Sequence, residues 1–422
     1  MLDFAKRKIC ANQLTNIMKG IAALAPTLLL TLILTSCMSD GYTDTAAGKS
    51  DTYINLNVST PTAQARANAP AGSTAGTSGS LKENETSPDP TDEEKIYSIR
   101  VWAFKSGTGE KAMPIGFKAE TGLKETGTHK VSMKLLRKAA GNLEKDNIDL
   151  YILLNAESIG VLNDNNCNRM TRQELKAKTF NSNFGINTDG SPQAKAVPAT
   201  GLPISRVITN INVKDNIADN AAAAADKPVS VPLVRAVSKL HFFFARKSGK
   251  DTESVTVTRI EVKGETLTKA SPVFPEAATD AEKDNNGLRG SFTGLTYLND
   301  QILKFGEIAT SKIKAVTEPK DYIRRPNETA QAYMDRLRKE DIQEGCISYL
   351  RETNVAITGK IYFKSNEAVA ERSVAFEIPE AYRNHELVVY GYFSGEALLD
   401  NFNLQYYVAN WNEKGATNIE FN

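Results

Sequence analysis

The sequence has few of the residues from which catalytic and metal sites are usually built. It contains three histidines and four cysteines in 422 residues. His129, His241 and His385 stand far apart, and none has a companion at a metal-ligating spacing. No G-x-S-x-G or H-E-x-x-H pattern occurs. We therefore expect no metal, no cofactor and no enzymatic activity. The aspartates and glutamates are numerous and scattered, so the sequence leaves open a catalytic carboxylate pair of the glycosidase kind.

Neither sign of charge dominates the chain, which has 51 lysines and arginines against 50 aspartates and glutamates. A net charge of +1 provides no electrostatic footprint for nucleic acid, so no nucleic-acid partner is predicted. Long apolar runs are also missing. The run at residues 21–34 has the length of a signal-peptide core and is too short for a comfortable transmembrane helix.

The N-terminus has the pattern of a targeting segment. A positively charged flank precedes the apolar run, which ends in Leu34-Thr35-Ser36-Cys37. This ending resembles a bacterial lipobox, in which a small residue precedes the cysteine that is lipidated. We predict that residues 1–37 are a lipoprotein signal peptide, with Cys37 as the palmitate-bearing site of a lipoprotein exported from a diderm cell. A plain secretory signal is the alternative, and either Met1 or Met18 can be the start.

Residues 52–58 have a clear strand pattern. Apolar residues alternate there with polar ones, which is the period of a half-buried β-strand. The apolar residues are Ile54, Leu56 and Val58. Residues 67–94 follow, and their Ala, Gly, Ser, Thr and Pro content is typical of a flexible loop.

Arg66 lies between this strand and the loop, and it is the only arginine between Arg7 and Arg100. A trypsin-like protease that cuts between Arg66 and Ala67 would detach residues 38–66, a propeptide that contains the strand. Flexible chain is the substrate that proteases require. An ordinary surface arginine is the alternative interpretation.

The remaining chain is predicted to be all-β. Short alternating runs recur through residues 95–214 and 229–422, which we assign to two β-sandwich domains joined by a linker at residues 215–228. Residues 148–154 are apolar almost throughout, as expected of a central strand.

Helices are predicted at two places. Thr171-Arg172-Gln173-Glu174 is a capping box that starts a short helix through Phe180. Residues 327–344 form an amphipathic pattern. Its apolar side is made of Tyr333, Met334, Leu337 and Ile342.

Cysteine is scarce after the signal segment. Only Cys167 and Cys346 follow Cys37, and they lie far apart in no C-x-x-C spacing. The sequence favours two free or buried thiols, and a disulfide is left open.

Several short patterns, taken in order, make the chain resemble the fimbrillin family, the type V pilins of Gram-negative bacteria. They are the lipobox, the strand at residues 96–104 after an arginine-bearing loop, the strand at residues 149–155 that ends in Asn, residues 201–205, residues 235–240, residues 383–385 and a late strand ending in Trp411. The chain departs from the family in having Ile204-Ser205 where Met-Ser-Gly is more frequent, and in the helix at residues 327–344.

The resemblance implies two transthyretin-like β-sandwich domains with a few short helices. It also implies that an arginine-specific protease removes the first strand and that a C-terminal strand of the next subunit fills the groove. Applied to this sequence, the resemblance implies that Cys37 is the lipid site, that the bond between Arg66 and Ala67 is cut, and that residues 404–421 are the donor segment. The candidate donor residues are Leu404, Tyr406, Val408, Trp411, Ile419 and Phe421. Which of the two runs, residues 404–408 or 417–421, is inserted stays open.

The expected function is that of a structural fimbrial shaft subunit that supports adhesion or biofilm formation on the cell surface. A sandwich that lacks one strand accepts a strand from another chain, and such a head-to-tail link builds an open filament. The expected partners are other copies or related fimbrial subunits, the protease, and the outer membrane before processing. The alternatives are an accessory anchor or tip subunit and a monomeric glycan-binding surface lipoprotein.

Overall fold

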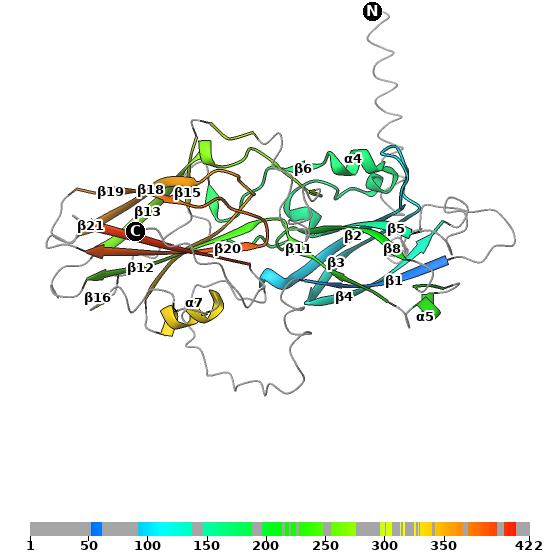
Figure 1. Cartoon of the computed structure of the whole chain (residues 1–422), viewed down its shortest axis with the longest axis horizontal. Coiled ribbons are helices and arrows are strands. Elements are labelled where there is room, and N and C mark those ends of the chain that lie inside the picture. The colour runs from blue at the N-terminus through cyan, green and yellow to red at the C-terminus, as the bar shows by residue number, and fades with distance from the viewer. Residues whose placement is uncertain are drawn as a thin grey trace, which may run out of the picture. The chain divides into compact units, whose positions relative to one another are not determined.

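The described part of the chain consists mainly of β-strands (Figure 1). This computed structural model describes residues 52–60, 92–136, 147–187, 196–212, 216–218, 221–224, 228–247, 255–275, 296–299, 301–305, 313, 315–316, 325, 328, 330–339, 342–365, 370–394 and 401–410. Its α-helices in these ranges are α4 (Arg172–Lys176), α5 (Ala221–Ala224) and α7 (Ala330–Lys339). Its 3-10 turns are η1 (Asp92–Glu94), η3 (Ala156–Ser158), η4 (Asn165–Arg169) and η5 (Gly264–Thr266). The predicted all-β class is confirmed.

Two sheets form a first sandwich. The β1 sheet has the order β10-β1-β4, with β9 also paired to β1. The β5 sheet has the order β11-β8-β5-β2-β3. The strand bounds are β1 (Thr52–Ser59), β2 (Lys95–Lys105), β3 (Gly116–Thr126), β4 (Thr128–Leu135), β5 (Asn147–Leu154), β8 (Ile204–Asn212), β9 (Ile217–Ala218), β10 (Val229–Pro232) and β11 (Val234–Arg235). Apolar side chains of both sheets meet in one core between them.

The β5 sheet is covered on both faces, which explains why its central strands are so apolar. Ile99 and Val101 of β2 face the core shared with the β1 sheet. Trp102 and Phe104 of the same strand face the opposite side, where they belong to a second core with Phe274. Two covered faces remove the polar alternation of an ordinary strand. The predicted central position of β5, between β8 and β2, is confirmed.

Two further sheets form a second sandwich. The β12 sheet has the order β16-β12-β20-β21, with β17 also paired to β12, and the β13 sheet has the order β19-β18-β13-β15-β7. The bounds are β7 (Ile186–Asn187), β12 (Ser238–Lys247), β13 (Val255–Lys263), β15 (Ile302–Phe305), β16 (Ala315–Val316), β17 (Gln343–Leu350), β18 (Ile357–Ser365), β19 (Arg372–Ile378), β20 (His385–Ser394) and β21 (Asn401–Asn410). Phe242 and Phe244 of β12 and Ile361 of β18 belong to the core between these sheets.

The two predicted helices form, and both are shorter than predicted. The capping box of α4 is present, with Thr171 N–H donating to Glu174 Oε2 over 2.7 Å. The helix ends at Lys176 because residues Thr179–Phe180 are β6, which pairs with β14 (Ser271–Pro272). Helix α7 places Tyr333, Met334 and Leu337 in a cluster with β12 and β20, so its predicted apolar side is confirmed.

Strand pairing crosses the predicted domain boundary at residues 215–228. β9 and α5 lie inside that predicted linker, and both contact β1. β10, which opens the predicted second domain, pairs with β1 in parallel. Residues 50–422 are one compact unit, and the division into domains at this boundary stays a prediction.

Candidate functional site: the central strand β1

β1 holds its sheet together. It pairs with β4 in antiparallel register at all eight positions, from Thr52 opposite Leu135 to Ser59 opposite Thr128. Its other edge is shared, because β9 pairs with Tyr53 and Ile54 and β10 runs parallel to residues 56–59. Among the described strands, β4, β9 and β10 have no ladder partner except β1. Removing β1 would therefore leave every other strand of the sheet with an unpaired edge.

The inward side chains of β1 fill the centre of the first core. Ile54, Leu56 and Val58 are each 0% exposed, and their polar neighbours in the strand are only half-buried. They pack with Val131 and Met133 of β4, among others. Burying each such side chain stabilises the fold by about 1.5–3 kcal/mol. A strand with this much buried apolar surface leaves readily only when another strand replaces it.

The C-terminal end of β1 is fixed by further hydrogen bonds. Thr60 donates to the carbonyl of Gly127 from its N–H over 2.8 Å and from its hydroxyl over 3.2 Å. Leu233 N–H donates to the carbonyl of Ser59 over 3.1 Å. These bonds hold the chain in register up to residue 60, six residues before the predicted cleavage site.

The outward residues of β1 lie beside polar residues of β4, two of which are lysines. In the register of the two strands, Tyr53, Asn55 and Asn57 stand opposite Lys134, Ser132 and Lys130. Asn55 Nδ2 donates to the carbonyl of Ala221 over 3.0 Å. Asn55 Oδ1 and Ser132 Oγ are buried atoms without a hydrogen-bond partner. Ser132 therefore has a buried hydroxyl that Asn55 does not bond, and Lys130 and Lys134 lie two residues to either side of it on β4.

His129 forms a charged cluster near the N-terminal end of β4, opposite Val58. Its ring nitrogens contact Glu125 and, over 2.8 Å, Glu120 of β3. Burial lowers the pKa of His129, but the hydrogen bonds and charges of both glutamates outweigh burial, so the net effect raises its pKa above the ordinary value. The protonated ring thus ties β3 to β4.

We expect His129→Gln to lower the free energy of unfolding by about 1–2 kcal/mol at pH 6. Because the pKa of His129 is raised in the folded state, its stabilising effect is complete below the unfolded pKa. That effect is lost as the pH rises through the folded pKa, so the difference from wild type should be smaller at pH 9. Urea titrations at both pH values measure it, with the exposed neighbour Thr128→Ala as control. An equal difference at both pH values would contradict the assignment.

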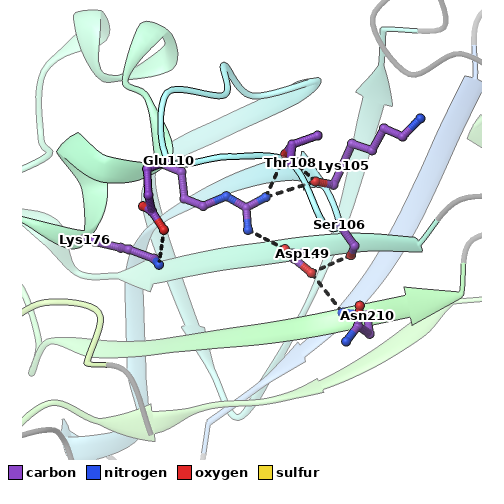
Figure 2. Close-up of polar contacts among 8 residues, drawn as sticks. Lys105, Ser106, Thr108, Glu110, Asp149, Lys176 and Asn210 are labelled. Carbon is purple, nitrogen blue, oxygen red and sulfur yellow. Dashed lines mark hydrogen bonds and ion pairs between the residues drawn. The ribbon is translucent and has the colours of Figure 1, made fainter. Parts of the chain in front are cut away.

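A buried ion pair fixes the opposite sheet of the first sandwich independently of β1 (Figure 2). Asp149 of β5 accepts hydrogen bonds from Ser106 Oγ over 2.6 Å, from Asn210 N–H over 2.9 Å and from Arg172 Nη1 over 2.6 Å. Arg172 also donates to the carbonyl of Lys105 over 3.0 Å. One carboxylate therefore joins α4 to the ends of three strands.

We expect Asp149→Asn to lower the free energy of unfolding by about 3 kcal/mol at pH 7, because Arg172 would be left buried without its counter-charge. Burial raises the pKa of Asp149, but the hydrogen bonds from Ser106, Asn210 and Arg172 lower it by more than burial raises it. The net effect is a pKa below the ordinary value. The ion pair's stabilising effect is therefore present above about pH 4 and is lost as the pH falls through the folded pKa.

Glu110→Gln is the matched control for this prediction. Glu110 forms a neighbouring but exposed ion pair with Lys176 over 2.8 Å, and exposed pairs contribute less than about 1 kcal/mol (Figure 2). Thermal or urea unfolding of both variants at pH 7 and pH 3 measures the contrast. Equal losses for Asp149→Asn and Glu110→Gln at pH 7 would show that the buried pair does not hold this end of the sheet.

The predicted site residues fall in three groups. Ile54, Leu56 and Val58 lie in β1, in the core. The predicted donor residues Leu404, Tyr406 and Val408 lie in β21, which is an edge strand paired only with β20 among the described strands. The remaining candidates lie outside the described residues: Cys37, Arg66, Ala67, Trp411, Ile419 and Phe421.

The two cysteines of the described region are free thiols. Cys167 and Cys346 are both buried. Burial raises the pKa of Cys167 to about 11 and that of Cys346 to about 12. Both thiols are therefore poorly reactive at neutral pH.

The described ranges contain no cluster of three or more metal-ligating side chains. No helix within them has the length and apolarity to span a bilayer.

The sequence pattern did not reveal the partners of β1. The parallel pairing of Leu56 with Val229 joins residues more than 170 positions apart, and the carboxylates around His129 come from another strand. The alternation of Val229, Val231 and Leu233 was the available signal for β10.

No protein-family model matches the sequence, and no curated protein matches it. Several solved structures are similar in arrangement. One is the tip fimbrial protein Mfa3 from Porphyromonas gingivalis with C-terminal truncation, at 11% identity over 86% of this chain and 100% of that chain, with a TM-score of 0.46. Another is a fimbrial assembly protein from Parabacteroides distasonis, at 11% identity over 88% of this chain and 100% of that chain, with a TM-score of 0.43. These likenesses are too distant to carry a function to this chain.

Proposed function

We propose that this chain is a fimbrial shaft subunit that polymerises when its own β1 is exchanged for a strand of a neighbouring copy. The observation that carries the proposal is the position of β1. It is the first described strand, yet it is the only ladder partner of β4, β9 and β10 among the described strands. A first strand in that position can be cut from the chain while the rest of the sandwich keeps its connectivity.

The β5 sheet supports this proposal because it does not depend on β1 for pairing. Its five strands form their own continuous ladder, and the Asp149–Arg172 ion pair ties its ends to α4. Loss of β1 would open a groove on one side of a sheet that stays folded. Main-chain pairing with a new strand would then supply affinity, and alternate side chains would set its register.

Processing completes the proposed cycle. Cys37 anchors the exported lipoprotein to the outer membrane, an arginine-specific protease cuts after Arg66, and the released subunit joins a filament on the cell surface. The donor is one of the two runs at residues 404–408 and 417–421. β21 lies at the edge of its sheet, so its departure would still leave β20 paired with β12.

Proteolysis of the full chain tests this function. We expect an arginine-specific protease to cut after Arg66 and a ladder of non-covalent multimers to form, measured by native mass spectrometry. Arg100, the next arginine, is only 3% exposed and lies within β2, so it should resist cleavage. A chain that is cut after Arg66 and stays monomeric at high concentration would favour a monomeric surface protein.

A further inference from the structure

Residues 417–422 repeat the first six residues of β1. The segment reads Thr-Asn-Ile-Glu-Phe-Asn, and residues 52–57 read Thr-Tyr-Ile-Asn-Leu-Asn. Three of the six positions are identical, and a fourth exchanges one large apolar residue for another. The identical pairs are Thr417 and Thr52, Ile419 and Ile54, and Asn422 and Asn57.

The repeat places matching residues on the buried face. Thr52 is 3% exposed, and Ile54 and Leu56 are 0% exposed. Aligned in the same order, Thr417, Ile419 and Phe421 would occupy these three positions. Register changes that keep the same face move in steps of two, so a shifted tail would put Thr417 or Phe421 where Ile54 now lies. The first shift places a polar residue at that fully buried position, and the second places the larger Phe421 there and Ile419 where Thr52 now lies. The apolar core therefore favours the unshifted alignment.

The outward face distinguishes the two segments at Asn55, because the tail has Glu420 there. That position is directly opposite Ser132, whose hydroxyl is buried without a hydrogen-bond partner. Lys130 and Lys134 are the diagonal neighbours on β4, within reach of long side chains. A carboxylate would accept a hydrogen bond from Ser132 and attract both lysines. It would give up the bond that Asn55 makes to the carbonyl of Ala221.

We propose that residues 417–422 of a second copy replace residues 52–57 on β4, with Glu420 opposite Ser132 and between the two lysines. This inference rests on the strand exchange proposed above and selects one of its two candidate runs. Residues 404–408 are the less suitable donor because β21 pairs with β20 at all ten of its positions. The acidic side chain also makes the tail a better ligand for the groove than β1 itself.

Cysteine pairs test the register. Glu420→Cys is combined in turn with Ser132→Cys, Lys130→Cys and Lys134→Cys, and each full chain is cut after Arg66 and oxidised mildly. These three positions lie on the same face of β4 and face β1 residues two apart, so their cross-strand pairs have the same geometry. Cleavage removes Cys10 and Cys37, and the remaining Cys167 and Cys346 are buried.

We expect covalent ladders on non-reducing gels with Ser132→Cys and much less with the other two. A strongest ladder at position 130 or 134 would overturn the register. Filaments without any of the three cross-links would show that another segment is donated, so the inference would fail while strand exchange survives. Wild-type chain that is cut and does not assemble would overturn both. Adding Arg66→Lys to the Ser132→Cys and Glu420→Cys chain is the control, because uncut β1 should block the cross-link.

A peptide competition tests the proposed preference for the tail. A peptide of residues 415–422 should displace β1 from the cut chain about fivefold more effectively than its Glu420→Gln version at low salt. The advantage should fall at 1 M salt, because the lysines of β4 are near the surface. Equal displacement by both peptides at low salt would overturn the role of the carboxylate.

Discussion

Arg66→Ala is expected to abolish assembly: treated with an arginine-specific protease, the variant should stay monomeric where the wild-type chain forms multimers. The reason is that β1 stays covalently attached to the rest of the chain. While β1 remains part of the chain it occupies its groove at a very high effective concentration, and a donor strand from another molecule cannot compete. Size-exclusion chromatography with light scattering, after equal protease treatment, measures the difference.

Arg66→Lys is the matched control for this prediction. It keeps the positive charge at residue 66 and removes only the guanidinium group that an arginine-specific protease recognises. If charge alone mattered, Arg66→Lys would assemble like the wild type. We expect it to stay monomeric like Arg66→Ala, and multimers of either uncut variant would contradict the account.

Leu56→Ala is expected to accelerate strand exchange in the cut chain. Leu56 is fully buried at the centre of β1, and truncating such a side chain costs about 2–5 kcal/mol. Since the loss weakens the hold of β1 on its groove, the departure of β1 after cleavage should be ~30-fold faster or more. Release of a fluorescent label placed on the propeptide follows the departure directly.

Asn57→Ala provides the comparison within the same strand. Asn57 is half-buried on the outward face, so its truncation should change the release rate much less than Leu56→Ala does. Both variants keep Arg66 and the same backbone pairing. Equal release rates for Leu56→Ala and wild type would mean that the departure of β1 is not what limits exchange.

Local pattern was sufficient to predict several elements. The alternation of Ile54, Leu56 and Val58 predicted β1 within one residue of its observed end at Ser59. The unbroken apolar run of β5 predicted a central strand, because both of its faces are covered. In each case the signal and the burial that causes it lie in the same few residues.

Two of the short motifs behind the family resemblance have a visible structural role. Asn155 adopts a left-handed conformation at the end of β5, and its side chain bonds to Tyr97 N–H over 2.8 Å and to the carbonyls of Lys95 and Leu202. Gly201 also has a positive φ of 77° and lies so close to Asn155 that a Cβ would clash with it. These residues join β2, β5 and the start of β8 in one hydrogen-bonded cluster.

A second hydrogen-bonded cluster involves the motif at residues 383–385. Arg383 is 0% exposed and donates to Glu352 over 2.7 Å and to the carbonyl of Pro272 over 2.9 Å. Asn384 accepts a hydrogen bond from Arg235 N–H over 3.3 Å. The motif residues are therefore explained by packing, which is why they indicate a fold more directly than an activity.

Other features depend on long-range pairing and have no local signal. Residues 179–187 fall within the predicted first domain, yet β6 and β7 pair with β14 and β15 of the later chain. The short helix α4 stops early for the same reason. Two-residue strands have no measurable periodicity, so only the tertiary contacts determine their partners.

The structure of the assembled form is the most direct test of the central claim. Electron cryomicroscopy of multimers made from the cut chain would show which strand lies between β4 and β10. The account predicts a strand that belongs to the neighbouring molecule, with residues 52–59 of the same molecule gone. Density that still traces residues 52–59 in that position, in a multimer held together elsewhere, would contradict it.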